Sequence, residues 1–328
     1  MTASPRTSTP HATSPVLLAE VVRGELVESV HFGSAIAVDP DGAVLFEVGA
    51  TRTPMFPRSA MKPLQSVGML DAGLDLDAEL LALACASHGG ERFHLEGVRR
   101  ILDQAGLAEA DLQNTPGFPL DEAAQAAYGT VPSSLAGNCS GKHAAMLATC
   151  VANDWPTVTY RMPDHPLQQR IAATVSELAG EAIATTAVDG CGAPLFGLSL
   201  HGLATAFGTI RKAKTTATQR VSTAVSEHPE WVASTTHPNT RLLRALPGSI
   251  GKGGAEGVLA LAVPDGPAIA IKIADGSHRP NPVLAVALLR TLGITNAELD
   301  ELAQVPVLGH GKPVGVVRAV EHLIPAFQ

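Results

Sequence analysis

Ser59 and Lys62 stand three residues apart in the stretch FPRSAMKPLQ, which covers residues 56–65. On a helix, this spacing places both side chains on one face, one turn apart. A neutral lysine amine in that position could accept the proton of the serine hydroxyl, and the positive end of the helix would favour the alkoxide that forms. Serine and lysine also occur at this spacing by chance, so the pair permits a nucleophilic site without proving one.

A second polar cluster lies in the segment CASHGGERFH, directly after an apolar run that predicts a helix. Its Gly-Gly turn could present Ser87 and His88 to a cavity. A helix C-cap would explain the two glycines equally well, and His88 could be an interior histidine with satisfied hydrogen bonds. Both interpretations stay open at this point.

The segments GNCSGKHAAM and VDGCGAP place reactive side chains at two expected helix starts. In the first segment, Cys139, Lys142 and His143 fall in the opening turn, where free backbone N–H groups stabilise a thiolate. Cys139 and Cys191 of the second segment could bind a metal together, although their separation along the chain is far outside zinc-finger spacing. A nucleophile formed by Cys139 and His143 is one alternative, and inert buried cysteines are another.

Two lysines lie in the last third of the chain. Lys272 interrupts an apolar strand in the segment IAIKIADGSHRP. A buried ammonium without a partner is costly, so this side chain either faces solvent or meets a partner in a site, and a solvated strand face is the simpler interpretation. Lys252 and Glu256 lie in the glycine-rich segment SIGKGGAEG, which lacks the pattern GxxxxGK[ST] and therefore does not predict a phosphate-binding loop.

The elements that must position these residues follow from apolar periodicity and turn residues. Turns at DPDG and PDGP predict two hairpins, formed by residues 30–38 with 43–48 and by residues 257–263 with 268–274. The expected helices cover residues 61–71, 77–87, 91–104, 144–152, 166–178, 192–206, 211–228 and 281–292. Strands near both chain ends with a helical middle predict an α/β (α+β) domain. In it the terminal hairpins share one sheet, residues about 60–245 supply a helical lobe, and a cleft lies between the two.

Composition limits the class of protein. The chain has 328 residues, 45% of them hydrophobic, which is enough for a substantial core. A formal net charge of −8 gives no reason to expect nucleic acid or an anionic membrane as partner, so a small-molecule substrate is expected. Four cysteines, no signal peptide and no membrane-spanning run predict a cytoplasmic protein. Residues 1–14 are expected to be a disordered tail, and residues 15–328 one catalytic domain.

Five motifs occur in the order RSAMKPLQ, CASHGGERFH, GNCSGKHAAML, VDGCGAP and GKGGAEGV. Together they resemble the bacterial L-asparaginase family of the Rhizobium etli type (asparaginase II-like), from about Val16 to about Val317. The resemblance implies a fold similar to serine β-lactamases and glutaminases: an antiparallel sheet flanked by helices, with a helical subdomain. It also implies that a homodimer hydrolyses L-asparagine to L-aspartate and ammonia.

The resemblance further implies the residues of the site. The catalytic residues are two Ser–Lys pairs, Ser59 with Lys62 and Ser87 with Lys272. A zinc ion beside the site is held by Cys139, Lys142 and Cys191. The substrate-binding residues are Arg58, His88, Asp189 and Gly254.

Our hypothesis from these expectations is that Ser59 attacks the side-chain amide of asparagine with Lys62 as general base, while Ser87 and Lys272 relay protons. Either serine has the chemistry of a nucleophile. A glutaminase is an alternative, because its substrate differs by one methylene. A β-lactamase-like amidohydrolase lacks support, since SDN-like and KTG motifs are missing and residues 272–274 read Lys-Ile-Ala. In a non-catalytic zinc-binding protein, both Ser–Lys pairs would be unexplained.

Overall fold

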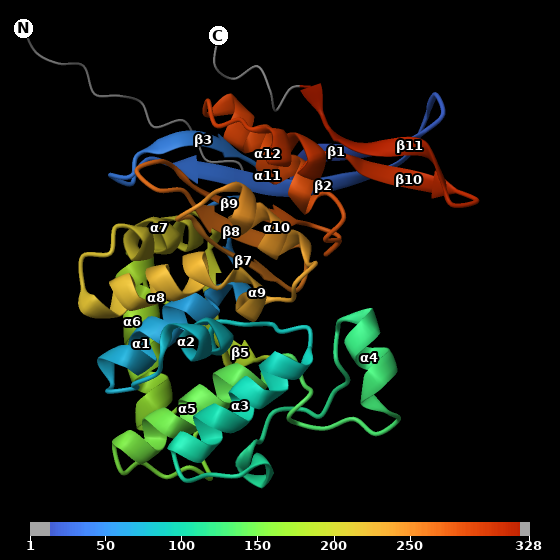
Figure 1. Ribbon diagram of the computed structural model, residues 1–328. Coiled ribbons are helices and arrows are strands. Elements are labelled where there is room, and N and C mark those ends of the chain that lie inside the picture. Colours follow the sequence, from blue (N-terminus) through green and yellow to red (C-terminus); the bar gives the residue numbers. More distant parts are fainter. Residues whose placement is uncertain (1–13, 322–328) are drawn as a thin grey trace, which may run out of the picture.

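A large antiparallel sheet forms one layer of the molecule (Figure 1). The computed structural model describes residues 14–321, so the predicted tail, except Ser14, lies outside the described residues. The sheet has the order β10-β11-β1-β2-β9-β8-β7, and β3 pairs with β2. Its strands are β1 (Val16–Arg23), β2 (Leu26–Val38), β3 (Val44–Val48), β7 (Ile250–Gly254), β8 (Val258–Ala262), β9 (Ala268–Ile273), β10 (Val305–Gly309) and β11 (Lys312–Ala319).

Both predicted hairpins are confirmed, and they share this sheet. In the first, β2 turns into β3 at DPDG, where Gly42 has a φ of 88°, a left-handed conformation that glycine adopts without strain. In the second, β8 turns into β9 at PDGP. Strand β2 joins the two ends of the chain, because Gly33 pairs with Val16 of β1 on one side and with Ile273 of β9 on the other.

Helices cover both faces of the sheet and build a lobe on one side of it (Figure 1). The helices of the central segment are η1 (Arg58–Met61), α1 (Lys62–Asp71), α2 (Ala78–Ala84), α3 (Arg92–Gln104), η2 (Glu109–Asp111), α4 (Glu122–Tyr128), α5 (Ser140–Ala152), α6 (Pro166–Ala179), α7 (Leu200–Arg211), α8 (Thr216–Glu227), α9 (Pro229–Val232) and α10 (Pro238–Ala245). Helix α7 packs against the sheet on the lobe side, while α11 (Asn281–Thr291) and α12 (Ala297–Leu302) lie over the opposite face. The predicted fold class, an antiparallel sheet flanked by helices with a helical subdomain, is therefore confirmed.

One predicted helix is wrong in its first half. Residues 192–206 begin as strand β6 (Pro194–Ser199), which pairs with β4 (Pro54–Met55) and β5 (Thr185–Val188) in a small second sheet. Every residue of β6 is buried, so its apolar run looked the same as that of a buried helix. Helix α7 begins only at Leu200, where the Ser199 hydroxyl accepts a hydrogen bond from the Gly202 N–H at 2.9 Å and caps the helix.

The outer part of the sheet keeps several large apolar side chains exposed. They include Leu26 and Phe32 on β2, Leu308 on β10 and Val314 on β11. An exposed apolar face of this kind is typical of an interaction surface. Within residues 14–321, none of the helices has the length and apolar character needed to cross a bilayer.

Candidate active site

The cleft predicted between sheet and lobe is present as a cavity of about 530 Å³ beside β7, the last strand of the sheet. Its walls include Ser59 of η1, Ser87 of the turn after α2, Asn138 before α5, and Lys252 and Gly254 of β7. Four separate segments of the sequence therefore meet at one cavity. Ser59, Ser87 and Gly254 are residues that the sequence placed in the site, whereas it missed the site role of Lys252.

Ser59 lies on a strained and tightly packed turn. The preceding residue, Arg58, has a φ of 53°, a left-handed conformation that is unfavourable for a residue with a side chain. Strand β7 presses against this turn at Gly254, where an added Cβ would lie 2.3 Å from the carbonyl oxygen of Pro57 and 2.8 Å from the nitrogen of Ala60. Glycine is thus required at position 254 for the close approach of two backbones, and the contact holds Ser59 at the wall of the cavity.

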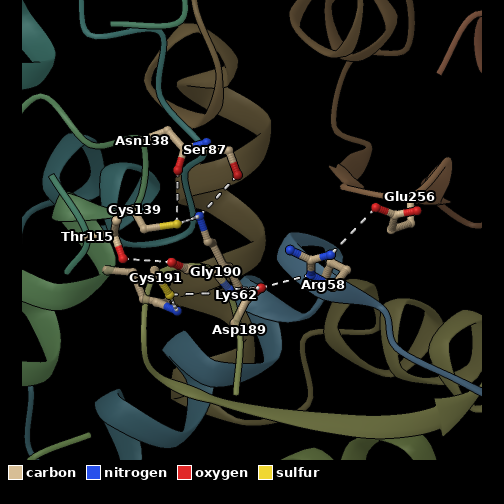
Figure 2. A network of polar contacts seen from close by, with 11 residues as sticks. Arg58, Lys62, Ser87, Thr115, Asn138, Cys139, Asp189, Gly190, Cys191 and Glu256 are labelled. Atoms are coloured by element: carbon tan, nitrogen blue, oxygen red, sulfur yellow. Dashed lines mark hydrogen bonds and ion pairs between the residues drawn. The ribbon is translucent and has the colours of Figure 1, made fainter. Parts of the chain in front are cut away.

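Lys62 lies in the first turn of α1 and is almost completely buried. Its Nζ donates hydrogen bonds to the Ser87 Oγ at 3.0 Å and the Cys139 Sγ at 3.2 Å (Figure 2). A third hydrogen bond goes to the Ala86 carbonyl at 2.5 Å. The three donors of its amine therefore match three acceptors. In this arrangement Lys62 bonds directly to Ser87, the serine of the other predicted pair.

Lys252 is the second lysine that reaches Ser87. Its Nζ lies 3.1 Å from the Ser87 Oγ and 2.7 Å from the Gly253 carbonyl, and its side chain is buried. Burial first, and then repulsion from Lys62, lower the pKa of Lys252 from 10.5 to about 7. A substantial fraction of this amine is therefore neutral near neutral pH and can accept a proton.

The predicted pairing of Ser87 with Lys272 is wrong. The Nζ of Lys272 donates to the carbonyl groups of Glu256 and Ile273, at 2.6 and 2.7 Å, on a half-buried part of β9. Lys252 occupies the position beside Ser87 that was predicted for Lys272. The role of Lys252 could have been found from the alternation of Ile250, Lys252 and Gly254, which places these three positions on one face of a strand. The glycines, however, made this segment look like a loop.

An ion pair lies next to the turn that carries Ser59, which we call the serine turn. Arg58 Nε donates to Asp189 Oδ1 at 2.8 Å, and its Nη1 lies 3.9 Å from Glu256 Oε1 (Figure 2). Burial raises the pKa of Asp189, but Lys142 and Arg58 outweigh it and hold that pKa below its usual value. Arg58 and Asp189, predicted to bind substrate, are thus brought together beside Ser59, although neither forms part of the cavity wall.

The three predicted zinc ligands also come together. Lys142 Nζ lies 3.2 Å from Cys191 Sγ, and the free thiol of Cys191 lies near enough to Cys139 to donate a hydrogen bond to its sulfur. This bond and the nearby Lys62 and Lys142 amines outweigh burial and hold the pKa of Cys139 well below its usual range. Cys139 is therefore poised as a thiolate, the form that binds metals.

The donor set of this cluster fits zinc. Among residues 14–321, no three His, Cys, Asp or Glu side chains are close enough together to hold a metal, so this cluster must use the amine as a third donor. Two cysteine sulfurs are ligands that zinc prefers, and the Lys142 amine adds a nitrogen donor. Burial lowers the pKa of Lys142, but the Cys191 and Cys139 sulfurs and Asp189 raise it above its usual value, so zinc would have to displace a proton from this amine.

Two histidines of the sequence analysis lie elsewhere. His88, predicted to bind substrate, is completely buried outside the cavity wall, and its Nε2 bonds with Ser140 Oγ at 2.8 Å. Burial and then His94 hold its pKa well below the usual value, so it is a neutral interior histidine. His143 bonds through Nδ1 with the Tyr160 hydroxyl at 2.6 Å, and its Nε2 has no hydrogen-bond partner among residues 14–321, which gives no support to a Cys139–His143 nucleophile.

Comparison with known proteins identifies the class of protein. The family model described as L-asparaginase II matches residues 19–319. The chain therefore belongs to the L-asparaginase II family, as the five motifs predicted, and it is an amidohydrolase. None of the curated proteins that were compared matches the chain.

Several solved structures are similar to this one at low sequence identity. Mglu in its native form is 11% identical with a TM-score of 0.41, and the match covers 75% of this chain but only 60% of the length of Mglu. A protein assigned as a β-lactamase, from Bacteroides dorei, is 14% identical with a TM-score of 0.42, and 80% and 93% of the two chains are covered. A Bacillus glutaminase is 12% identical with a TM-score of 0.33, and 83% and 88% are covered.

Proposed function

We propose that this protein is an L-asparaginase that hydrolyses L-asparagine to L-aspartate and ammonia through an acyl-enzyme on Ser59. The observation that carries the proposal is the Ser87 hydroxyl, which bonds to two buried lysine amines at the wall of a cavity that Ser59 also lines. A carboxamide is a poor electrophile, so its hydrolysis needs an activated nucleophile and a proton donor for the departing nitrogen. Membership of the L-asparaginase II family supports the choice of substrate.

Ser59 is the better nucleophile of the two serines. Its hydroxyl makes no hydrogen bond to another side chain within residues 14–321, so it is free to approach a carbonyl carbon. It also lies at the start of η1 and α1, where unpaired backbone N–H groups favour negative charge. Ser87, by contrast, is held between two amines, a position that suits the transfer of protons between them.

Lys252, Ser87 and Lys62 form the proton relay. In the first half of the reaction, the neutral amine of Lys252 accepts the proton that leaves Ser59, and Lys62 and Ser87 transfer the proton between them. The same groups return a proton to the leaving nitrogen, so that ammonia departs and not an amide anion. Water then attacks the ester, and aspartate leaves. Lys252 in this way takes the role that the sequence hypothesis gave to Lys272.

We propose that zinc binds at Cys139, Lys142 and Cys191. Bound there, zinc would supply a fixed positive charge that holds the segments before α5 and β6 together beside the site. Asp189 lies two residues from Cys191 and pairs with Arg58, so these side chains connect the zinc cluster with the turn that carries Ser59. We also expect a homodimer.

The test of this function is ammonia release from L-asparagine and L-glutamine side by side. We expect turnover of asparagine, its loss in Ser59→Ala and a large reduction in Ser87→Ala, with Ser29→Ala on the exposed part of β2 as the matched control. Intact-mass analysis of the quenched reaction should show an aspartyl adduct that is absent in Ser59→Ala. Faster release from glutamine would identify a glutaminase, and an adduct on Ser87 would reverse the roles of the two serines.

A further inference from the structure

The cavity continues past the catalytic groups and round the edge of the sheet. In β7, the side chain of Lys252 points to the catalytic side, so the alternation of a strand places Gly253 on the opposite face. Gly253 pairs with Leu259 of β8, which lies on that same opposite face. Both residues line the cavity that Ser59 and Ser87 line. The cavity therefore connects the two faces of the sheet across its open edge.

The part of the cavity beyond this edge is mainly apolar, and we call it the rear compartment. Its walls are Leu259 of β8, Leu242 of α10, Pro282 of α11 and Leu302 of α12, together with Asn239 and Asn281. The acidic residues of the cavity wall lie on a different segment, at the start of α4, and its lysine points to the catalytic side. The cavity wall also contains His237, directly before α10, and His278, and burial lowers the pKa of both below the usual value, which favours their neutral forms. The rear compartment thus offers apolar surface and two neutral amides, and no charged partner within the described cavity wall.

The two asparagines have unused hydrogen-bonding capacity. Asn239 and Asn281 are 6% and 7% exposed, and the Oδ1 atom of each has no hydrogen-bond partner among the described residues. These two oxygens are closed off from the cavity, so the amides add only uncharged surface to its wall. An uncharged group with an apolar body therefore matches this compartment.

Asparagine itself cannot fill the rear compartment. Its carboxylate and ammonium groups would lose hydration there without gaining a charged partner, so they must stay on the polar side of the cavity. The rear compartment can therefore hold only a substituent on the amide nitrogen, which is the other side of the scissile bond. In asparagine that nitrogen carries only hydrogen. A cavity of about 530 Å³ is in the range that accommodates drug-sized ligands, well above the needs of one small amino acid.

We propose that the enzyme also hydrolyses secondary amides of the β-carboxyl group of aspartate whose nitrogen carries an uncharged apolar group, with that group seated in the rear compartment. This inference rests on the proposed function and extends its substrate class. The chemistry balances as for asparagine. The Ser59 Oγ forms a bond to the carbonyl carbon, the C–N bond breaks, and the amine leaves with a proton from the relay. Water then cleaves the ester to release aspartate and restore the serine.

The test compares kcat/KM for L-aspartate β-benzylamide, β-aspartylphenylalanine and L-asparagine. The first two compounds carry the same phenyl ring, and the second adds a carboxylate and one methylene to the leaving group. We expect turnover of the benzylamide, and about tenfold or more discrimination against the dipeptide, because its carboxylate finds no charged partner in the compartment.

Two variants locate the compartment. Leu302→Trp fills the compartment from α12. Gly253→Val narrows the cavity where it rounds the edge of the sheet, and an added Cβ at Gly253 would meet only the Val258 carbonyl at 3.8 Å. Each should lower the ratio of kcat/KM for the benzylamide to that for asparagine by about tenfold or more. The matched control is Leu308→Trp on the exposed surface of β10, which should leave this ratio unchanged.

The outcomes separate the two proposals. Turnover of asparagine without turnover of the benzylamide overturns the extended substrate class and leaves the asparaginase function in place. Turnover of neither compound overturns the asparaginase function, and the extension with it. Turnover of the benzylamide with an unchanged ratio in both Leu302→Trp and Gly253→Val shows that the apolar group binds elsewhere, which refutes the rear compartment as its site.

Discussion

Replacing Lys252 with methionine should make the protein inactive and, at the same time, more stable. The side chain is 4% exposed, and its amine has two hydrogen-bond acceptors, Ser87 Oγ and the Gly253 carbonyl, but no carboxylate partner among residues 14–321. Burial and the nearby Lys62 lower the pKa of Lys252 from 10.5 to about 7. Below pH 10.5 the amine is protonated in the unfolded chain, so keeping or losing that proton in the folded protein costs folding free energy. Methionine has a similar length and carries no charge.

The magnitude follows from the two pKa values. A fall from 10.5 to about 7 is equivalent to about 5 kcal/mol of lost folding free energy at pH values below 7, and to about 4 kcal/mol at pH 7. Because the folded pKa is the lower one, the unfolded chain binds more protons between the two values, so this penalty disappears as the pH rises toward 10.5. Loss of the hydrogen bond to the Gly253 carbonyl costs about 1–3 kcal/mol in the variant, which leaves a net gain of about 2 kcal/mol near neutral pH.

Urea unfolding measured at about pH 7 and again at about pH 10 checks this reasoning. The variant should exceed the wild-type protein in free energy of unfolding at the lower pH, and the difference should shrink or reverse at the higher one. Lys312→Met, at an exposed position on β11, is the matched control and should change neither value appreciably. A Lys252→Met protein that is less stable than wild type at pH 7 would refute the assignment of a desolvated, nearly neutral amine.

Four further results are expected. Asparagine turnover should rise with pH through about 7 as Lys252 loses its proton, and in Lys252→Arg, whose charge is permanent, a pH profile of kcat/KM should show no such rise. Gly254→Ala should abolish turnover and lower the melting temperature by several degrees, since its Cβ would lie 2.3 Å from the Pro57 carbonyl; a fully active variant would contradict the close packing of β7 on the serine turn. Metal analysis should find about one zinc per chain in the wild-type protein and little in Cys191→Ser, and equal zinc in both would exclude this cluster as the site. Sedimentation should show a dimer that Phe32→Lys, on the exposed apolar face of the sheet, converts to monomer, and an unchanged dimer would place the interface elsewhere.

The sequence was most informative where a motif and its local structure coincide. Ser59 and Lys62 were expected at the start of a helix because a proline precedes an apolar periodicity, and η1 and α1 are there. The turns at DPDG and PDGP predicted both hairpins from residues only a few positions apart. Five motifs in a set order indicated the L-asparaginase II family, which the match over residues 19–319 confirms.

The sequence was misleading where one residue type fits two environments. Lys272 lies in β9 and Lys252 in β7, on either side of β8 in the same sheet, and nothing local to either lysine shows which amine is buried. Pairing decides between them: β7 is the edge strand next to the serine turn, whereas Lys272 of β9 pairs with Ser34 and Val258 and bonds to carbonyl groups there. His88 was ambiguous for the same reason, because only the tertiary structure shows that it lies behind the cavity wall.

By itself, the sequence determined the chemistry available to this protein: which hydroxyls, amines and thiols it has, the short segments that carry them, and the family to which the order of those segments belongs. The tertiary structure decided which of these groups meet, since contacts between Lys62, Ser87 and Lys252 join segments from three distant parts of the chain. The physical reason is that helix and turn formation depends on neighbours in sequence, whereas the pKa of a buried amine depends on desolvation and on charges that only folding brings near.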